Sequence, residues 1–183
     1  MAVANGFCEH TSPRSPLFDE GRLLAKDLIN YKLGRNLPPA NATAKTLRKL
    51  SDDIELRNPD LLERLCSKLN FSKETGYSSF CEIAKEVFGD GIINWGRIAV
   101  LYAFCAKLGK YCNENNMSDE IENLTQWTAT FVTELGWIES QGGWSGLNNR
   151  FRDLGENSSG WWKNALITTA LGIGSLAVFT VCK

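Results

Sequence analysis

The segment from Trp95 to about Cys112 constrains the fold most, because it is apolar on almost every side when it is arranged as a helix. In its middle, eight consecutive residues carry no charge and run Ile-Ala-Val-Leu-Tyr-Ala-Phe-Cys from position 98 to 105. A helix of this kind is stable only when other elements cover it on all sides. We therefore expect it at the centre of a bundle, with Asn94 as its N-terminal cap.

The rest of the chain predicts further helices, because apolar residues recur at a spacing of three and four and sustained period-two alternation is absent. The expected helices are Leu17 to Leu33, Asn41 or Thr43 to the residue before Pro59, a short one holding Leu61 to Leu69, one from Ser79 to Phe88, one holding Ile121 to Leu135, and two short ones around Trp137 and from Trp144 to Leu154. Ser79 and Glu82 form a capping box that would open the fourth of them. The expected fold is an all-α bundle of seven to eight helices around a buried central hairpin.

Composition excludes several classes of function. The 20 lysines and arginines against 21 aspartates and glutamates leave a formal charge of −1, which disfavours nucleic-acid binding by bulk electrostatics. The single histidine, His10, leaves no set of partners for Ser-His-Asp or Cys-His catalysis or for a multi-histidine metal site. No Cys-x-x-Cys pair occurs, and we interpret the six cysteines as reduced thiols: Cys8, Cys66, Cys81, Cys105, Cys112 and Cys182. We expect no metal and no cofactor.

The C-terminal stretch predicts a membrane anchor. From Asn164 to Cys182 the chain has 19 residues without a charge, preceded by Trp161, Trp162 and Lys163. As a helix this stretch would be about 28 Å long, close to the roughly 30 Å of a bilayer's hydrocarbon core. The tryptophans suit the interface, and the flanking lysines can reach the headgroups. The alternative is a buried core helix, since threonines and a serine dilute the hydrophobicity. The N-terminus, residues 1–16, shows no signal peptide, and we expect it to be flexible.

Four segments, in this order along the chain, resemble the homology motifs of the B-cell-lymphoma-two (Bcl) family of apoptosis regulators. Residues 24–33 resemble the fourth motif and residues 47–54 the third. Residues 90–98, which contain Asn-Trp-Gly-Arg at 94–97, resemble the first, and residues 136–144 resemble the second. The resemblance covers almost the whole chain from Leu17 onward. It implies a helical domain over residues 17–160, followed by a tail anchor over residues 161–183.

The family resemblance implies an apolar groove that binds an amphipathic helix. By the resemblance its walls come from Ile54, Arg57, Leu62, Leu65, Ile83, Val87, Val100 and Phe104, with Phe151 closing one end. Each apolar member, taken singly, is also typical of a hydrophobic core. The family often has an aromatic residue at the Ile54 position and a tyrosine at the Asn58 position. The residues found here therefore imply a pocket of different shape.

Arg97 is the charged residue to which the resemblance gives a role. It falls in the first turn of the helix that begins at Trp95, where the helix dipole disfavours a cation, so we expect it to have a partner. The resemblance supplies one: the aspartate of a bound helix, in a charge-assisted and bidentate contact. The alternative is a solvated surface arginine. Asn94, Trp95 and Gly96 belong to the same expected site, and Gly96 would allow a helix to approach closely.

The third motif has two expected roles, either as part of the groove wall or as a death-helix-like ligand that docks into another molecule. Its residues are Leu47, Leu50, Ser51, Asp52 and Ile54. The first of the four usual apolar positions holds Thr43, and a serine replaces the more common glycine. We favour the role in the groove wall.

The resemblance implies a regulator of apoptosis that binds the amphipathic death (BH-three) helix of pro-apoptotic relatives, both Bak/Bax-type effectors and helix-only activators. It would thereby restrain permeabilisation of the mitochondrial outer membrane from its cytosolic face, with the endoplasmic reticulum as a further location. We favour this pro-survival role because the fourth motif matches well and the connection from Gly34 to Ala40 is short. The alternative is a Bak-like effector that oligomerises and permeabilises the membrane.

A membrane-anchored hydrolase is the alternative from a different class. Its candidate carboxylate pairs, Asp52 with Asp53 and Asp119 with Glu120, are adjacent in sequence. Adjacent residues on a helix point about 100° apart and do not converge on one substrate. The sequence also lacks a glycine-rich phosphate loop and a nucleophile elbow. We therefore expect a binding protein and not an enzyme.

Overall fold

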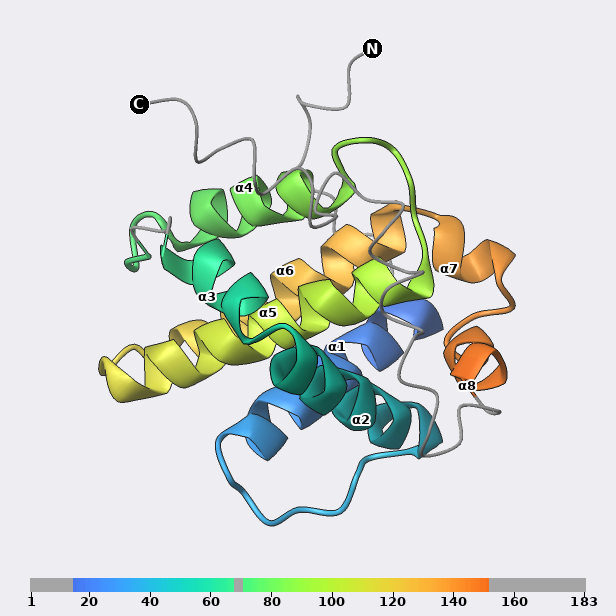
Figure 1. Cartoon of the computed structure of the whole chain (residues 1–183), viewed down its shortest axis with the longest axis horizontal. Helices are drawn as coiled ribbons and strands as arrows, with labels where there is room; N and C mark the ends of the chain where they lie inside the picture. Colours follow the sequence, from blue (N-terminus) through green and yellow to red (C-terminus); the bar gives the residue numbers. More distant parts are fainter. Residues whose placement is uncertain (1–14, 68–70, 152–183) are drawn as a thin grey trace.

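The computed structural model describes residues 15–67 and 71–151, which form eight helices and contain no strand (Figure 1). The helices are α1 (Pro16–Lys32), α2 (Ala42–Arg57), α3 (Pro59–Ser67), α4 (Gly76–Phe88), α5 (Trp95–Glu114), α6 (Glu120–Glu134), α7 (Trp137–Ser140) and α8 (Ser145–Phe151). The prediction of an all-helical bundle is confirmed for this part of the chain. No helix within it is both long enough and apolar enough to cross a bilayer. The expected anchor, residues 161–183, lies outside the described residues.

Helix α5 runs through the middle of the molecule, as its sequence predicts (Figure 1). It packs against α1, α2, α3, α4 and α6, and every residue from Trp95 to Ala106 is buried. The expectation of a buried hairpin needs a correction at its second arm. Helix α6 buries one face, which includes Leu124 and Val132, while its other faces are partly exposed. Polar residues on those faces, such as Glu122 and Gln126, make α6 amphipathic.

Side-chain caps fix the start of three helices. The side-chain oxygen of Asn94 accepts a hydrogen bond from the Arg97 N–H at 2.9 Å, which confirms the predicted cap of α5. Asn41 caps α2 in the same way, through the Ala44 N–H at 2.8 Å. Ser15 caps α1.

The start of α4 differs from the expected capping box. This helix begins at Gly76, so Ser79 lies inside it and donates its N–H to the Thr75 carbonyl at 2.9 Å. Local hydrogen bonds shape the turn before it, since the Ser72 N–H donates to the Thr75 hydroxyl at 3.0 Å and the Thr75 N–H donates to the Ser72 hydroxyl at 3.3 Å. The rings of Phe71 and Trp127 also pack closely on this start, where a Cβ at Gly76 would lie 3.1 Å and 3.3 Å from them.

Candidate helix-binding site around Arg97

Arg97 lies in the first turn of α5 and is completely buried, with 0% of the residue exposed. Its guanidinium makes a bidentate ion pair with Asp90: Nη2 lies 2.6 Å from Oδ2, and Nη1 contacts Oδ1. Nη1 also donates to the Ile92 carbonyl at 2.5 Å. Arg97 therefore has an acidic partner within the chain itself, whereas the expected partner was the aspartate of a bound helix. A bidentate carboxylate compensates for the unfavourable helix dipole at this position.

The loop between α4 and α5 supplies this partner. The Oδ1 atom of Asp90 accepts the Ile92 N–H at 3.0 Å, which shapes the loop around the guanidinium. Gly91 turns the chain with a φ of +77°, a conformation that favours glycine. The Asp90 side chain is 28% exposed, against 1% for the Arg97 side chain. The ion pair thus reaches the protein surface through its acid.

The apolar residues of the expected groove come from four helices and belong to one hydrophobic cluster. They are Ile54 of α2, Leu62 and Leu65 of α3, Ile83 and Val87 of α4, and Val100 and Phe104 of α5. Helices α2, α3 and α4 each pack on α5, which brings these side chains together. All seven are at most 2% exposed, so they form core in this structure and not an open trough. Arg57 is exposed at the end of α2, and half-buried Phe151 packs on the cluster from α8.

Trp95 joins the first motif to the second through an aromatic cluster. Its ring lies edge-on to Trp137 at a centroid distance of 5.0 Å and 6.1 Å from the Trp144 ring. Gly96 is buried in the same turn of α5. Gly146 admits a close contact here, since a Cβ at that position would lie 2.9 Å from the Trp95 ring. Sequence reasoning missed this contact, since Gly146 lies far from Trp95 along the chain.

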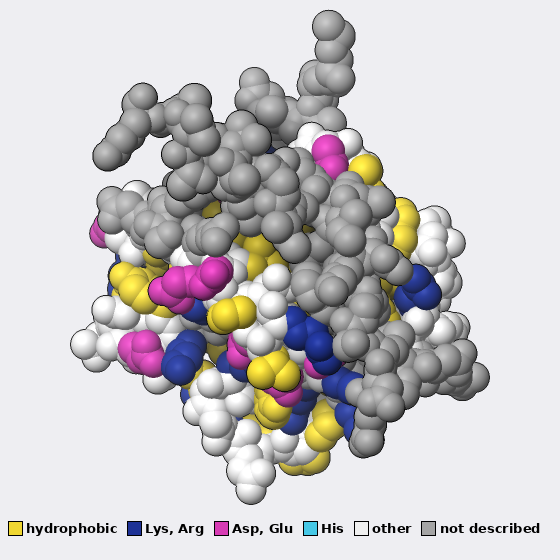
Figure 2. All heavy atoms as spheres, viewed as in Figure 1, with side chains coloured by type: hydrophobic (Ala, Val, Ile, Leu, Met, Phe, Trp, Pro, Cys, Tyr) yellow, Lys and Arg dark blue, Asp and Glu magenta, His cyan; other side chains and the backbone are white. Residues whose placement is uncertain are grey.

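The third motif faces inward. Leu47, Leu50, Ser51 and Ile54 are buried, whereas Asp52 is exposed. Figure 2 shows basic and acidic side chains interspersed on the face that contains α2, whose exposed residues are Ala42, Lys45, Lys49, Asp52, Glu55, Leu56 and Arg57. The motif is thus an integral part of the folded domain.

Two groups of polar contacts tie α2 to α1. Asp52 accepts hydrogen bonds from the Tyr31 hydroxyl and the Lys32 ammonium, each at 2.7 Å, and Lys32 also contacts Glu55 at 2.8 Å. The second group is a buried ion pair between Asp27 and Arg48, which sequence reasoning missed. A charge at position 27 on the otherwise apolar side of a helix was the available signal.

The pKa values at the α1–α2 contact follow from these bonds. Burial by itself lowers the pKa of Lys32, but the hydrogen bonds and the charges of Asp52 and Glu55 outweigh burial and raise it overall. The hydrogen bond to Asp52, together with burial, raises the pKa of Tyr31. Both shifts favour protonated side chains that donate to Asp52 at neutral pH. Across residues 15–67 and 71–151 no group of three or more His, Cys, Asp or Glu side chains could hold a metal ion.

Known proteins resemble the chain along most of its length. A sequence model of the apoptosis regulator proteins of the Bcl-2 family matches residues 47–144, more than half of the chain. Apoptosis regulator R1 from Xenopus laevis is 29% identical over 171 residues, which cover 85% of this chain and 75% of that protein. Human apoptosis regulator BAX is 31% identical over 146 residues, which cover 72% of this chain and 74% of that protein. Rat Bcl-2-like protein 1 is 32% identical over 127 residues, which cover 68% of this chain and 52% of that protein. The chain thus matches about half of that relative's length.

Solved structures share the fold. Zebrafish pro-survival protein NRZ in complex with Bad BH3 superposes with a TM-score of 0.68 at 23% identity, covering 74% of this chain and 94% of that one. Trichoplax adhaerens trBcl-2L2 bound to trBak BH3 superposes with a TM-score of 0.64 at 23% identity, covering 74% of this chain and 99% of that one. The matched family model, the relatives and the shared helical fold together show that the chain belongs to the Bcl-2 family of apoptosis regulators.

Proposed function

We propose that this chain binds the BH3 helix of pro-apoptotic relatives at a site built from α2, α3, α4 and α5, and so restrains permeabilisation of the mitochondrial outer membrane. One observation carries the proposal. The guanidinium of Arg97 is buried beside an apolar cluster from four helices, and its acidic partner is partly exposed. An amphipathic helix with an apolar face and an acid offers both complementary features.

The burial of the lining residues indicates how a helix would enter. Because Leu62, Leu65, Ile83 and Val87 are core residues here, a ligand has to move α3 away from α5 and replace its contacts there with the ligand's own apolar face. Helix α3 suits this movement, since it is only nine residues long and begins directly after Asn58 at Pro59. Two solved structures with this fold, trBcl-2L2 and NRZ, contain a bound BH3 segment, from Bak and from Bad, which supports BH3 segments as ligands here.

A pro-survival role is supported by the way α2 is held. Its motif residues face the core, and both Asp52 and Arg48 are paired with residues of α1. A helix that contacts both the core and α1 is better suited to form a wall of the site than to leave the domain as a ligand. NRZ, which shares the fold, is described as a pro-survival protein. We further propose that residues 161–183 anchor the chain in the mitochondrial outer membrane or the endoplasmic reticulum, with the domain in the cytosol.

Peptide binding tests the site. The full chain is titrated into a fluorescent Bak BH3 peptide and into the same peptide with the aspartate of its third-motif pattern changed to alanine. We expect the wild type to bind the unchanged, acidic peptide more tightly, and Arg97→Gln to lower the affinity for the acidic peptide roughly 30-fold or more. Lys49→Gln removes an exposed cation of α2 and should leave the affinity nearly unchanged. Circular dichroism checks folding of each variant. Equal affinity of the wild type for both peptides would argue against contact between the acid and Arg97.

Dye release from liposomes of mitochondrial outer-membrane lipids tests the direction of the effect. A Bak effector activated by a BH3 peptide is assayed with and without the full chain. Suppressed release is the expected result. Release caused by this chain and peptide without Bak would instead identify an effector.

A further inference from the structure

We propose that Asp90 is an internal competitor for Arg97, so that a bound helix must displace its carboxylate before the helix's own acid can pair with the two Nη atoms of the guanidinium. The inference rests on the proposed function, and it adds a residue that sets which ligands bind. Both carboxylate oxygens of Asp90 accept hydrogen bonds from the two Nη atoms of Arg97. A second carboxylate can bind the same two Nη atoms in a bidentate geometry only after Asp90 has moved.

The two partners differ in how readily they can move. Arg97 belongs to the first turn of α5, its side chain is 1% exposed, and its backbone N–H is held by Asn94. Asp90 belongs to the loop between α4 and α5, next to Gly91, and its side chain is 28% exposed. When the pair opens, the carboxylate therefore turns toward water while the guanidinium stays in place.

Exchange of one acid for another also avoids the main cost of opening the pair. A buried arginine without a counter-charge is strongly destabilising. An incoming carboxylate neutralises Arg97 as Asp90 leaves, so the buried charge stays compensated. A helix without an acid cannot do this and has to bind with the pair closed. Asp90 therefore reduces the affinity gained from a ligand's acid, and it leaves binding of a neutral helix unaffected.

The opposite role for Asp90 would be to position Arg97 for the ligand, and the two roles predict opposite signs. If Asp90 competes, weakening its hold on Arg97 strengthens binding of an acidic helix. If Asp90 positions the guanidinium, the same change weakens binding. Asp90→Asn suits the comparison because it removes the charge and keeps a side-chain oxygen that can accept the Ile92 N–H.

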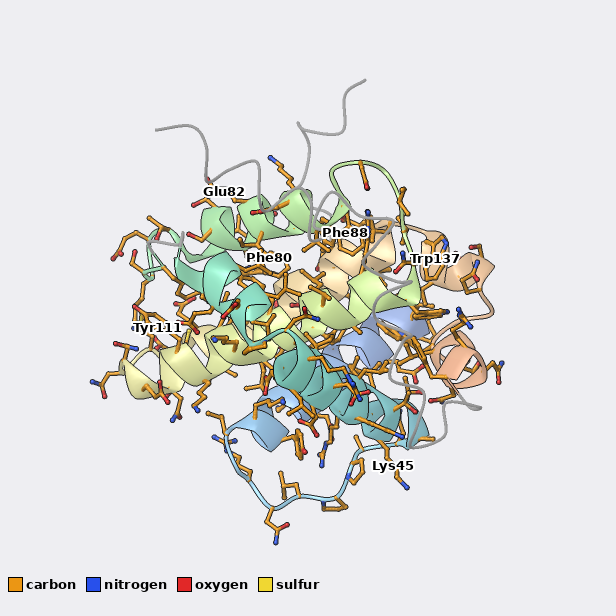
Figure 3. All side chains as sticks on the ribbon, viewed as in Figure 1. Lys45, Phe80, Glu82, Phe88, Tyr111 and Trp137 are labelled. Atoms are coloured by element: carbon orange, nitrogen blue, oxygen red, sulfur yellow. The ribbon has the colours of Figure 1, made fainter. Side chains whose placement is uncertain are left out.

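The experiment uses the full chain and two fluorescent Bak BH3 peptides, one with its aspartate and one with asparagine in its place. We expect Asp90→Asn to raise affinity for the acidic peptide by about tenfold and to change affinity for the asparagine peptide by less than about twofold. The matched control is Glu82→Gln, which removes one negative charge from the outer side of α4, whereas Phe80 and Phe88 lie on its inner side (Figure 3). This control should alter both affinities slightly and equally.

Hydrogen exchange of the wild type provides a second readout. Binding of the acidic peptide should speed amide exchange in residues 89–92, because the Ile92 N–H loses its acceptor when Asp90 leaves. The asparagine peptide should not have this effect. If a folded Asp90→Asn variant binds the acidic peptide with unchanged or lower affinity, the proposal that Asp90 competes for Arg97 is overturned. The proposed function still stands in that case, provided that the wild type binds the acidic peptide. If neither protein binds either peptide, the proposed function fails as well.

Discussion

The guanidinium of Arg48 on α2 donates hydrogen bonds to both carboxylate oxygens of Asp27 on α1, with Nε 2.7 Å from Oδ2 and Nη2 2.8 Å from Oδ1. The same pair organises the loop between the two helices. Asp27 accepts the Ala40 N–H at 2.9 Å, and Arg48 donates to the Leu37 carbonyl at 3.0 Å. Tyr31 covers the guanidinium, whose carbon lies 4.8 Å from the ring centroid. The contact thus fixes α1, α2 and their connection in one arrangement.

Removing one side of this pair should be costly. Arg48→Met leaves the buried Asp27 without its counter-charge, and we expect the free energy of unfolding to fall by about 3–5 kcal/mol. Urea denaturation followed by circular dichroism measures the change. Lys49→Met, at the exposed neighbouring position, should stay within about 0.5 kcal/mol of the wild type. A loss below 1 kcal/mol for Arg48→Met would mean that the pair contributes little to the fold.

The contacts of Lys32 should weaken in alkali. The folded-state pKa of Lys32 lies above its ordinary value of 10.5, so its contribution to stability is fully present below that value and is lost as the pH rises through the folded pKa. We expect Lys32→Met to be about 0.5–1 kcal/mol less stable than the wild type at pH 8. The gap should narrow at pH 11. Unfolding free energies of both proteins at the two pH values test this, and a constant gap would contradict it.

A close approach of α1 to α5 depends on Gly109. A Cβ at this position would lie 2.8 Å from Cγ2 of Ile29, which is closer than real contacts allow. Gly109→Ala should therefore lower stability by about 1–3 kcal/mol through overpacking. In a background of Ile29→Ala, which removes the clashing atoms, the same change should cost much less. Thermal unfolding of the four proteins gives the coupling, and strict additivity would exclude the clash as the cause.

The buried cysteines Cys105 and Cys112 and the half-buried Cys66 should resist alkylation in the folded protein. Burial raises the pKa of the Cys105 thiol to about 12, and that of Cys66 and Cys112 to about 11. At pH 8 only about one Cys105 thiol in ten thousand is then the reactive thiolate. Iodoacetamide at pH 8, read by peptide mass spectrometry, should modify these three residues in urea and spare them in buffer. Rapid modification of Cys105 in buffer would show that the centre of the bundle opens readily.

Local patterns along the chain fixed much of the fold in advance. The all-round apolar helix at the centre, the cap at Asn94 and the approximate ends of α1 and α2 follow from side-chain periodicity, from asparagine caps and from Pro59, which act over one or two turns. The expected capping box at Ser79 was wrong, because α4 begins at Gly76, directly after a turn in which Ser72 and Thr75 hydrogen-bond to each other.

The sequence by itself determined which segments are helices, which one is central, and which residues carry the family motifs, because these properties depend on neighbours three or four positions away. The sequence also indicated that Arg97 needs a partner. Only the tertiary structure decided that Asp90 supplies it, that Arg48 pairs with Asp27, and that the apolar residues of the expected groove are core. A buried charge has to be compensated by whichever group the packed helices bring within reach, and that depends on the whole fold.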